Sequence, residues 1–179
     1  MRIISGYLKG RKITQPNSKF TRPLKDLTKE SIFNIIKHSN LTDLKIEKSI
    51  ILDLFSGVGS FGLECISRGA KNVTFCENYP ESIKILKKNI INFRCKEKTK
   101  IIIENIFNIK KFDQLHNKKF EIIFLDPPYK EKKLNNLLND ILSLKLLKNN
   151  GIIVIHRHKK EEEFYPEKFK VLKIKTYGI

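Results

Sequence analysis

The chain has 179 residues and a formal net charge of +17, from 36 lysines and arginines against 19 aspartates and glutamates. Hydrophobic residues at 40% beside charged residues at 31% exclude a disordered chain and favour one globular domain. The longest apolar runs are short and the N-terminus lacks the apolar core of a signal peptide, so we expect a cytoplasmic protein without a membrane span.

The first 40 residues are predicted to form a basic appendage. Residues 2–16 contain two β-prone runs around a Lys-Gly turn, which is typical of a short β-hairpin. Residues 24–38 place apolar side chains at roughly helical spacing, which predicts a helix that ends near Asn40.

From residue 50 onward, strands and helices alternate. The pattern predicts strands over 50–55, 72–77, 100–104, 120–125 and 151–156. It predicts helices over 60–68, 80–92 and 132–147, the last closed by Asn-Asn-Gly, and a poorer helix or turn over 106–115. Near-continuous apolar strands that alternate with helices are typical of a parallel sheet covered on both faces. We therefore predict one doubly wound α/β unit, in which residues 41–179 form the main domain and residues 1–40 its extension.

Cysteines and histidines give no pattern of a disulfide framework or a metal centre. Cys65, Cys76 and Cys95 are odd in number and lack C-x-x-C spacing, which indicates buried free thiols. His156 and His158 alternate at the end of an expected strand, but no third ligand stands near them. We predict no metal site.

The positive charge favours a polyanionic partner, although a lysine-rich composition can also arise from compositional drift in a low-GC genome. Residues 1–30 argue against drift alone, because they contain three of the six arginines and only two acidic residues. We predict a nucleic-acid contact in this segment. Its cations are Arg2, Lys9, Arg11, Lys12, Lys19, Arg22, Lys25 and Lys29.

A glycine-rich loop follows the first core strand. In 53-DLFSGVGSFG-62, Gly57, Gly59 and Gly62 form G-x-G-x-x-G between a strand and a helix, where glycines permit close backbone approach to a ligand. Glu77 ends the next strand, where a carboxylate can accept hydrogen bonds from ribose hydroxyls. NAD and S-adenosylmethionine (SAM) both bind in this way, and glycines needed only for packing would look the same. Asp53 favours SAM, because it could face an amino-bearing ligand rather than a pyrophosphate.

The strand in 120-FEIIFLDPPYK-130 ends in Asp126, Pro127, Pro128 and Tyr129. The prolines stiffen the loop and have no N–H groups, so their carbonyls can face a ligand. Asp126 and the Pro127 carbonyl could accept hydrogen bonds from both N–H groups of an exocyclic amine on a nucleobase. The nitrogen lone pair would then point toward a methyl group. Tyr129 offers a face on which the base, once out of its stack, can pack.

Other functions remain open on these residues. Methylation of adenine N6 or cytosine N4 in DNA uses the same tetrapeptide, but such enzymes usually carry a target-recognition domain for which 179 residues leave no room. Methylation of a protein glutamine would favour Asn-Pro-Pro-Tyr. A nicotinamide-dependent oxidoreductase would have no use for Asp-Pro-Pro-Tyr, and a non-catalytic module that binds SAM or RNA is the last alternative.

The chain resembles the RsmD-type methyltransferases over nearly its whole length. The resemblance is carried by DLFSGVGSFG, Glu77 and DPPY, and by the preceding segments RIISGYLKGRKI and 21-TRPLKDLTKESIFNII-36. The resemblance implies a Rossmann-like class I methyltransferase fold, SAM as cofactor, and transfer of a methyl group to the N2 amine of a guanine in small-subunit (16S) ribosomal RNA. It also implies a partner that is ribosomal RNA, in a small subunit or an assembly intermediate. We expect a monomer.

The resemblance further implies a role for individual residues. A catalytic loop would consist of Asp126, Pro127, Pro128 and Tyr129. The cofactor would be held by Arg22, Asp53, Phe55, Gly57, Gly59, Glu77, Asn78, Asn105, Ile106 and Asp126, with residues 1–40 also serving as a lid. RNA would be contacted by Arg2, Lys9, Arg11, Lys12 and Arg22.

Two departures from the family pattern stand out. Leu24, Leu27 and Lys29 replace the usual threonine and arginine residues near the Arg-Pro segment, which changes what that helix can contact. The pattern also predicts a strand over 168–176 and a turn at residues 177 and 178, with a seventh strand expected after Ile179, where the given sequence stops.

Overall fold

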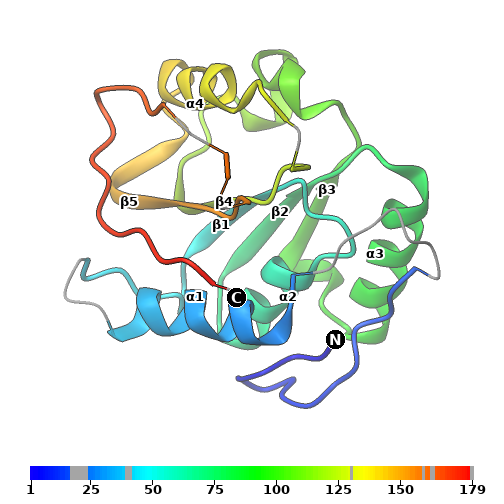
Figure 1. Ribbon diagram of the computed structural model, residues 1–179. Coiled ribbons are helices and arrows are strands. Elements are labelled where there is room, and N and C mark those ends of the chain that lie inside the picture. Colours follow the sequence, from blue (N-terminus) through cyan, green and yellow to red (C-terminus); the bar gives the residue numbers. More distant parts are fainter. Residues whose placement is uncertain (17–23, 39–41, 130, 159, 162–163, 178–179) are drawn as a thin grey trace.

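The computed structural model describes residues 1–16, 24–38, 42–129, 131–158, 160–161 and 164–177. It contains a five-stranded parallel sheet in the order β3-β2-β1-β4-β5, with helices on both faces (Figure 1). The strands are β1 (Ile50–Leu54), β2 (Asn72–Cys76), β3 (Thr99–Ile102), β4 (Phe120–Leu125) and β5 (Leu147–Ile155). The predicted α/β fold with a parallel sheet is confirmed.

The helices lie at the positions that the apolar pattern predicts, except that α4 ends early. They are α1 (Asp26–His38), α2 (Ser60–Ser67), α3 (Pro80–Asn92) and α4 (Leu134–Ser143), together with the 3-10 helices η1 (Lys96–Lys98), η2 (Ile106–Lys111) and η3 (Asp113–Leu115). Among the described residues, no helix is both long enough and apolar enough to cross a bilayer.

Side chains that alternate along the central strands build two separate cores. Ile51, Ile122 and Phe124 pack with α1, α2 and α3 on one face, where the rings of Phe61 and Phe124 stack with centroids 4.0 Å apart. On the other face, Leu52, Leu54, Ile123 and Leu125 pack with η2, η3 and α4. Burial of both faces explains why these strands are mostly apolar rather than alternating regularly with polar residues.

The three cysteines are buried free thiols, as predicted. Burial raises the pKa of the Cys65 and Cys76 thiols above the ordinary range. A thiol with a raised pKa is a poor nucleophile, so these residues belong to the cores and not to a reactive site.

The prediction for the end of α4 was wrong. The Asn-Asn-Gly segment was expected to close the helix, but α4 ends at Ser143 and Lys145 adopts φ 52, so that the chain reverses before Leu146. Asn149, Asn150 and Gly151 lie within β5, where the register against β4 shifts between Phe120 and Ile122. The extra residues form an irregularity in the strand instead of a helix cap.

The N-terminal segment pairs with itself as predicted, but through a single antiparallel bridge between Arg2 and Lys12 and not through two full strands. It packs on α2. Ser67 Oγ accepts a hydrogen bond from the backbone N–H of Leu8 at 2.9 Å, and the Tyr7 N–H donates to the Ser67 carbonyl at 2.9 Å. Gly6 sits so close to the Ser67 backbone that a Cβ would lie 1.8 Å from its oxygen.

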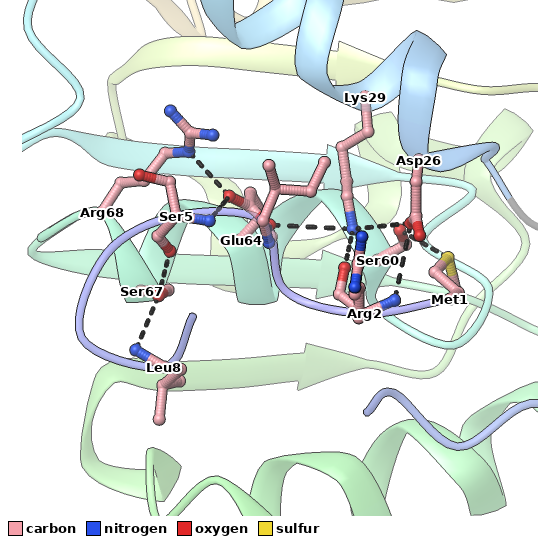
Figure 2. A network of polar contacts seen from close by, with 12 residues as sticks. Met1, Arg2, Ser5, Leu8, Asp26, Lys29, Ser60, Glu64, Ser67 and Arg68 are labelled. Carbon is pink, nitrogen blue, oxygen red and sulfur yellow. Dashed lines mark hydrogen bonds and ion pairs between the residues drawn. The ribbon is translucent and has the colours of Figure 1, made fainter. Parts of the chain in front are cut away.

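A buried ion pair fixes this segment between α1 and α2 (Figure 2). The Lys29 ammonium donates to the Arg2 carbonyl at 2.7 Å and lies 3.7 Å from Glu64, and both side chains are fully buried. Glu64 also accepts the backbone N–H groups of Ile4 and Ser5 and the Arg68 guanidinium, at 2.7 to 2.9 Å. Lys29 was grouped with the cations that face a polyanion, but its burial excludes it from that surface.

The predicted strand over 168–176 was also wrong. The structure has no strand in this segment, which runs as an extended chain beside α1 (Figure 1). The Tyr177 hydroxyl and the Lys175 ammonium contact Ser31 Oγ at 2.6 and 3.0 Å. The β-prone residues have no sheet edge as partner here, so they form side-chain contacts instead of a backbone ladder.

Candidate active site

The expected location of a ligand site in this fold is the carboxyl edge of the sheet, where the strand order reverses. The chain passes from β1 through β2 to β3 on one side and then returns to β4 on the other side of β1. Open α/β sheets bind ligands in the crevice at such a switch point. The loops that follow β1 and β4 meet there, and they carry the glycine loop and Asp126.

The glycine loop combines strained backbone with an open approach. Phe55, Gly57 and Gly59 have φ values of 59, 53 and 86°, in the left-handed region that a bulky residue such as Phe55 rarely adopts. A Cβ on Gly57 would meet no atom within 4 Å, so this turn faces open space, whereas a Cβ on Gly59 would lie 2.5 Å from Leu86. Gly59 is required for packing, and Gly57 leaves room for a ligand.

Ser56 provides an independent sign of a ligand at this loop. The residue is 8% exposed, and its hydroxyl oxygen has no hydrogen-bond partner among the residues that the structure describes. A buried polar atom without a partner is costly and rare in folded proteins. A polar group of a bound molecule against the loop would supply the missing partner.

Glu77, at the end of β2, is 8% exposed and organises the loop. One of its carboxylate oxygens accepts the backbone N–H of Gly57 at 2.7 Å, and the other accepts those of Asn78 and Tyr79 at 2.9 Å each. A carboxylate offers about four lone-pair sites, so capacity remains for a ligand hydroxyl. Glu77 thus lies at the end of β2, as the sequence predicted, and its hydrogen bond to Gly57 connects this strand end with the loop after β1.

Asp53 lies beneath the loop and is 1% exposed. Its carboxylate accepts the Gly62 N–H at the start of α2 at 3.0 Å. Burial raises the pKa of the Asp53 carboxyl well above its ordinary value, and the Asp126 and Glu77 carboxylates raise it further, although the Gly62 N–H opposes the shift. A cationic ligand group beside Asp53 would relieve this cost, because it would compensate three neighbouring acidic side chains.

Asp126 follows β4 on the same side of the sheet as Asp53, and its side chain is 18% exposed. Pro127 is buried, Pro128 is exposed and Tyr129 is partly exposed. The Pro128 carbonyl accepts two hydrogen bonds from within the protein, from Arg157 Nη1 at 2.9 Å and from the Glu131 N–H at 3.0 Å. Of the two prolyl carbonyls, Pro127 is therefore the better candidate to accept a substrate amine.

The remaining predicted cofactor residues are placed around this edge with different exposures. The exposed Asn105 caps η2 by accepting the Phe107 N–H at 3.1 Å, whereas Ile106 is 3% exposed and belongs to the second core. The rings of Phe55 and Phe107 lie 5.7 Å apart, tilted by 57°. Asn78 is exposed beside Glu77, and Arg22 lies outside the described residues.

Four of the predicted RNA contacts, Arg2, Lys9, Arg11 and Lys12, are exposed on the N-terminal segment. Arg11 reaches the end of α3, where it donates to the Asn92 carbonyl at 2.7 Å and lies 5.0 Å from the centroid of the Phe93 ring. The segment is therefore anchored at both ends, on α2 by Glu64 and Ser67 and on α3 by Arg11. Its exposed cations are therefore presented by a segment that is packed against α2 and α3.

Comparison with known proteins decides the family. Residues 1–179 match the protein family described as "Conserved hypothetical protein 95". The chain belongs to this family. Its relatives include Ribosomal RNA small subunit methyltransferase D of Haemophilus influenzae, 34% identical over 180 residues that cover 100% of this chain and 90% of the relative. The protein of the same name from Escherichia coli K12 is 30% identical over 84% of this chain and 68% of its own length. The resemblance to RsmD-type proteins is confirmed.

Solved structures agree with this family assignment. A candidate methylase from Haemophilus influenzae has a TM-score of 0.73 and 32% identity and covers 99% of this chain and 92% of its own. A candidate methyltransferase from Escherichia coli has a TM-score of 0.83 at 24% identity, over 99% of this chain and 92% of its own. The second likeness shows the fold alone.

Sequence reasoning missed one group of residues at this edge of the sheet, the segment from His156 to His158. His156 Nδ1 lies 2.8 Å from Asp126 Oδ1, and the ring of His158 lies 5.0 Å from that of Tyr129. The histidine pair was examined only as a metal site. The signal that could have found this contact is positional, because β5 runs parallel to β4 and both strands end at the same edge.

Proposed function

We propose that this chain is a SAM-dependent methyltransferase that acts on ribosomal RNA. The observation that carries the proposal is the convergence of the glycine loop, Asp53, Glu77 and Asp126 on one edge of the sheet. Relatives that are 30% or more identical, and that this chain covers for most of their length, are named as ribosomal RNA small subunit methyltransferases. This supports the same activity here.

The residues present fit SAM in three respects. Glu77 retains capacity for ribose hydroxyls, the open turn at Gly57 permits backbone approach, and the unpartnered Ser56 hydroxyl suits a polar cofactor group. Asp53 would attract the amino group of the methionine portion. When bound, SAM supplies an electrophilic methyl group.

The catalytic loop then acts by orientation. The Asp126 carboxylate and the Pro127 carbonyl accept hydrogen bonds from the two N–H groups of an exocyclic amine. These hydrogen bonds draw the nitrogen lone pair out of conjugation and toward the methyl carbon. Acceptors already fixed in place stabilise the positive charge that develops on nitrogen. Tyr129 packs against the extruded base. No nucleophile from the protein is required.

The finer assignment is to the N2 amine of a guanine in small-subunit RNA. A carboxylate and a carbonyl form a pair of acceptors that suits an exocyclic NH₂ group, and the exposed cations of the N-terminal segment suit a folded RNA. The names of the relatives specify ribosomal RNA of the small subunit and leave the base open. Guanine N2 thus rests on the sequence resemblance.

Incubation with methyl-labelled SAM tests the proposal. Naked small-subunit RNA, intact small subunits and duplex DNA are offered separately, and the label in each polymer is counted. We expect label in RNA or in the subunit. Label in duplex DNA alone would favour a DNA base methyltransferase, and binding of NADH without binding of SAM would overturn the methyltransferase proposal.

A further inference from the structure

The three residues that follow β5 each contact a different member of the catalytic loop. His156 Nδ1 meets Asp126 Oδ1 at 2.8 Å, Arg157 Nη1 donates to the Pro128 carbonyl at 2.9 Å, and the His158 ring lies edge-on to Tyr129 at a 5.0 Å centroid distance and a 68° angle. Contacts of three consecutive residues with Asp126, Pro128 and Tyr129 follow from the geometry of the sheet, because β4 and β5 run side by side and end together.

From these contacts we infer that His156, Arg157 and His158 form a positioning clamp for the catalytic loop, in which His156 sets the orientation of the Asp126 carboxylate. The inference rests on the proposed function for its role in catalysis, whereas the contacts stand independently. His156 and Arg157 are positioning residues, since they act through the loop and not on the substrate.

The His156 contact assigns separate tasks to the two oxygens of Asp126. A neutral imidazole donates from one ring nitrogen only, and a carboxylate only accepts, so Nδ1 must carry the proton that faces Oδ1. The hydrogen bond fixes the rotation of the carboxylate about its side-chain bond. It leaves Oδ2 to accept the substrate amine at a defined angle.

Arg157 holds the backbone of the catalytic loop through the Pro128 carbonyl. Its Nη1 and Nη2 atoms donate to the carbonyls of Pro128 and Glu131, at 2.9 and 2.7 Å, and its side chain is only 9% exposed. The planar guanidinium presents its two N–H donors in a rigid fork that fits both carbonyls, whereas a lysine ammonium is a single, freely rotating centre. The loop is therefore held at two points, and its Pro127 carbonyl is fixed between them.

Kinetics of variants test the role in catalysis. His156→Ala should lower kcat about tenfold to hundredfold, because small misplacements of reacting groups have effects of this size. The KM for SAM and the melting temperature should stay close to wild type. His156→Asn should recover most of kcat, since its amide nitrogen can replace the Nδ1–H donor. The matched control is His116→Ala, an exposed histidine beside Asp113, which should leave kcat unchanged.

A spectroscopic measurement tests the contact without any need for activity. In the nitrogen NMR spectrum of the full chain at alkaline pH, His156 should hold the Nδ1–H tautomer, and Asp126→Ala should shift it toward Nε2–H. An Nε2–H tautomer in the wild type would overturn the clamp, as would equal kcat values for His156→Ala and wild type. If the wild type transfers no methyl group but shows the Nδ1–H tautomer, the proposed function fails while the contact stands.

Discussion

Two polar networks hold loops against the body of this protein, and they differ in their access to solvent. Lys29 and Glu64, under the N-terminal segment, are fully buried, whereas Asp126 and His156, at the catalytic edge, are each 18% exposed. A closed ion pair has no room for a ligand, so the first network can only hold structure in place. The second keeps an opening through which a substrate can reach the carboxylate. Change in the first should therefore affect stability, and change in the second should affect chemistry.

Removal of the Asp126 carboxylate gives the largest expected effect. Asp126→Ala should lower kcat by about 10²–10³-fold, the size seen when one preorganised partner of a developing charge is lost. Single-turnover transfer of labelled methyl to RNA measures this. Asp113→Ala, at a carboxylate that is 94% exposed and is not among the residues assigned to the site, serves as the control and should retain full activity. Equal losses in the two variants would contradict a specific role of Asp126 in the reaction.

Removal of the Lys29 ammonium should break the other network. Lys29→Ala leaves Glu64 buried without its cation from α1, and loss of one partner of a buried pair costs about 3–5 kcal/mol. The remaining contacts of Glu64 with Arg68 and the backbone place the expected loss of unfolding free energy at the lower end of that range. Urea denaturation measures it. Lys37→Ala, at an exposed lysine of the same helix, should lie close to wild type. A Lys29→Ala protein of normal stability would contradict the structural role.

Asp53 allows the two effects to be separated at a single residue. Its raised pKa means that the stability it contributes is fully present below its ordinary value of 3.8 and is lost as pH rises through the folded value. Asp53→Asn has no carboxyl to ionise and does not lose this stability as pH rises. In the absence of SAM, the difference between its melting temperature and that of the wild type should therefore increase in favour of the variant from about pH 4 upward. Its affinity for SAM should fall about tenfold, by roughly the value of one lost charged hydrogen bond. If the melting temperatures of the variant and the wild type differ by the same amount at every pH, the burial of a titrating carboxyl at residue 53 is contradicted.

The smallest expected effect concerns the exposed cations. Lys9→Ala with Lys12→Ala should weaken RNA binding only a few-fold at moderate salt, and should reduce the slope of log affinity against log salt by about 2. Filter binding across salt concentrations measures the slope. The control pair, Lys118→Ala with Lys119→Ala, is exposed just before β4 and outside the N-terminal segment. If both pairs change the slope equally, the charge acts through composition and not through a defined surface.

The sheet and its loops could be predicted from the sequence because each strand carries its own local signal. The bounds of α3 and β4 were predicted as observed, since Pro80 fixes the first turn of α3 and the two prolines after Asp126 end β4. Asp53 and Glu77 were placed correctly at neighbouring strand ends for the same reason. Apolar runs and turn residues are sufficient for such features.

The remaining features depend on contacts between distant segments. Lys29 appears in the sequence as one more cation, and only the packing of α1 on α2 shows that Glu64 buries it. His156 contacts Asp126 because β5 is the neighbour of β4, which follows from the order of the strands and not from a motif. The segment 168–176 has strand-like residues but lacks a strand partner. Pairing and burial are properties of the whole fold, so a local pattern cannot show them.

The most direct test of the proposed function is the identity of the methylated nucleoside. RNA from reacted small subunits is digested to nucleosides and analysed by mass spectrometry, with the wild type and Asp126→Ala in parallel. The proposal predicts N2-methylguanosine with the wild type and none above background with the variant. A methyl group found on adenine or cytosine, or N2-methylguanosine formed equally well by Asp126→Ala, would contradict it.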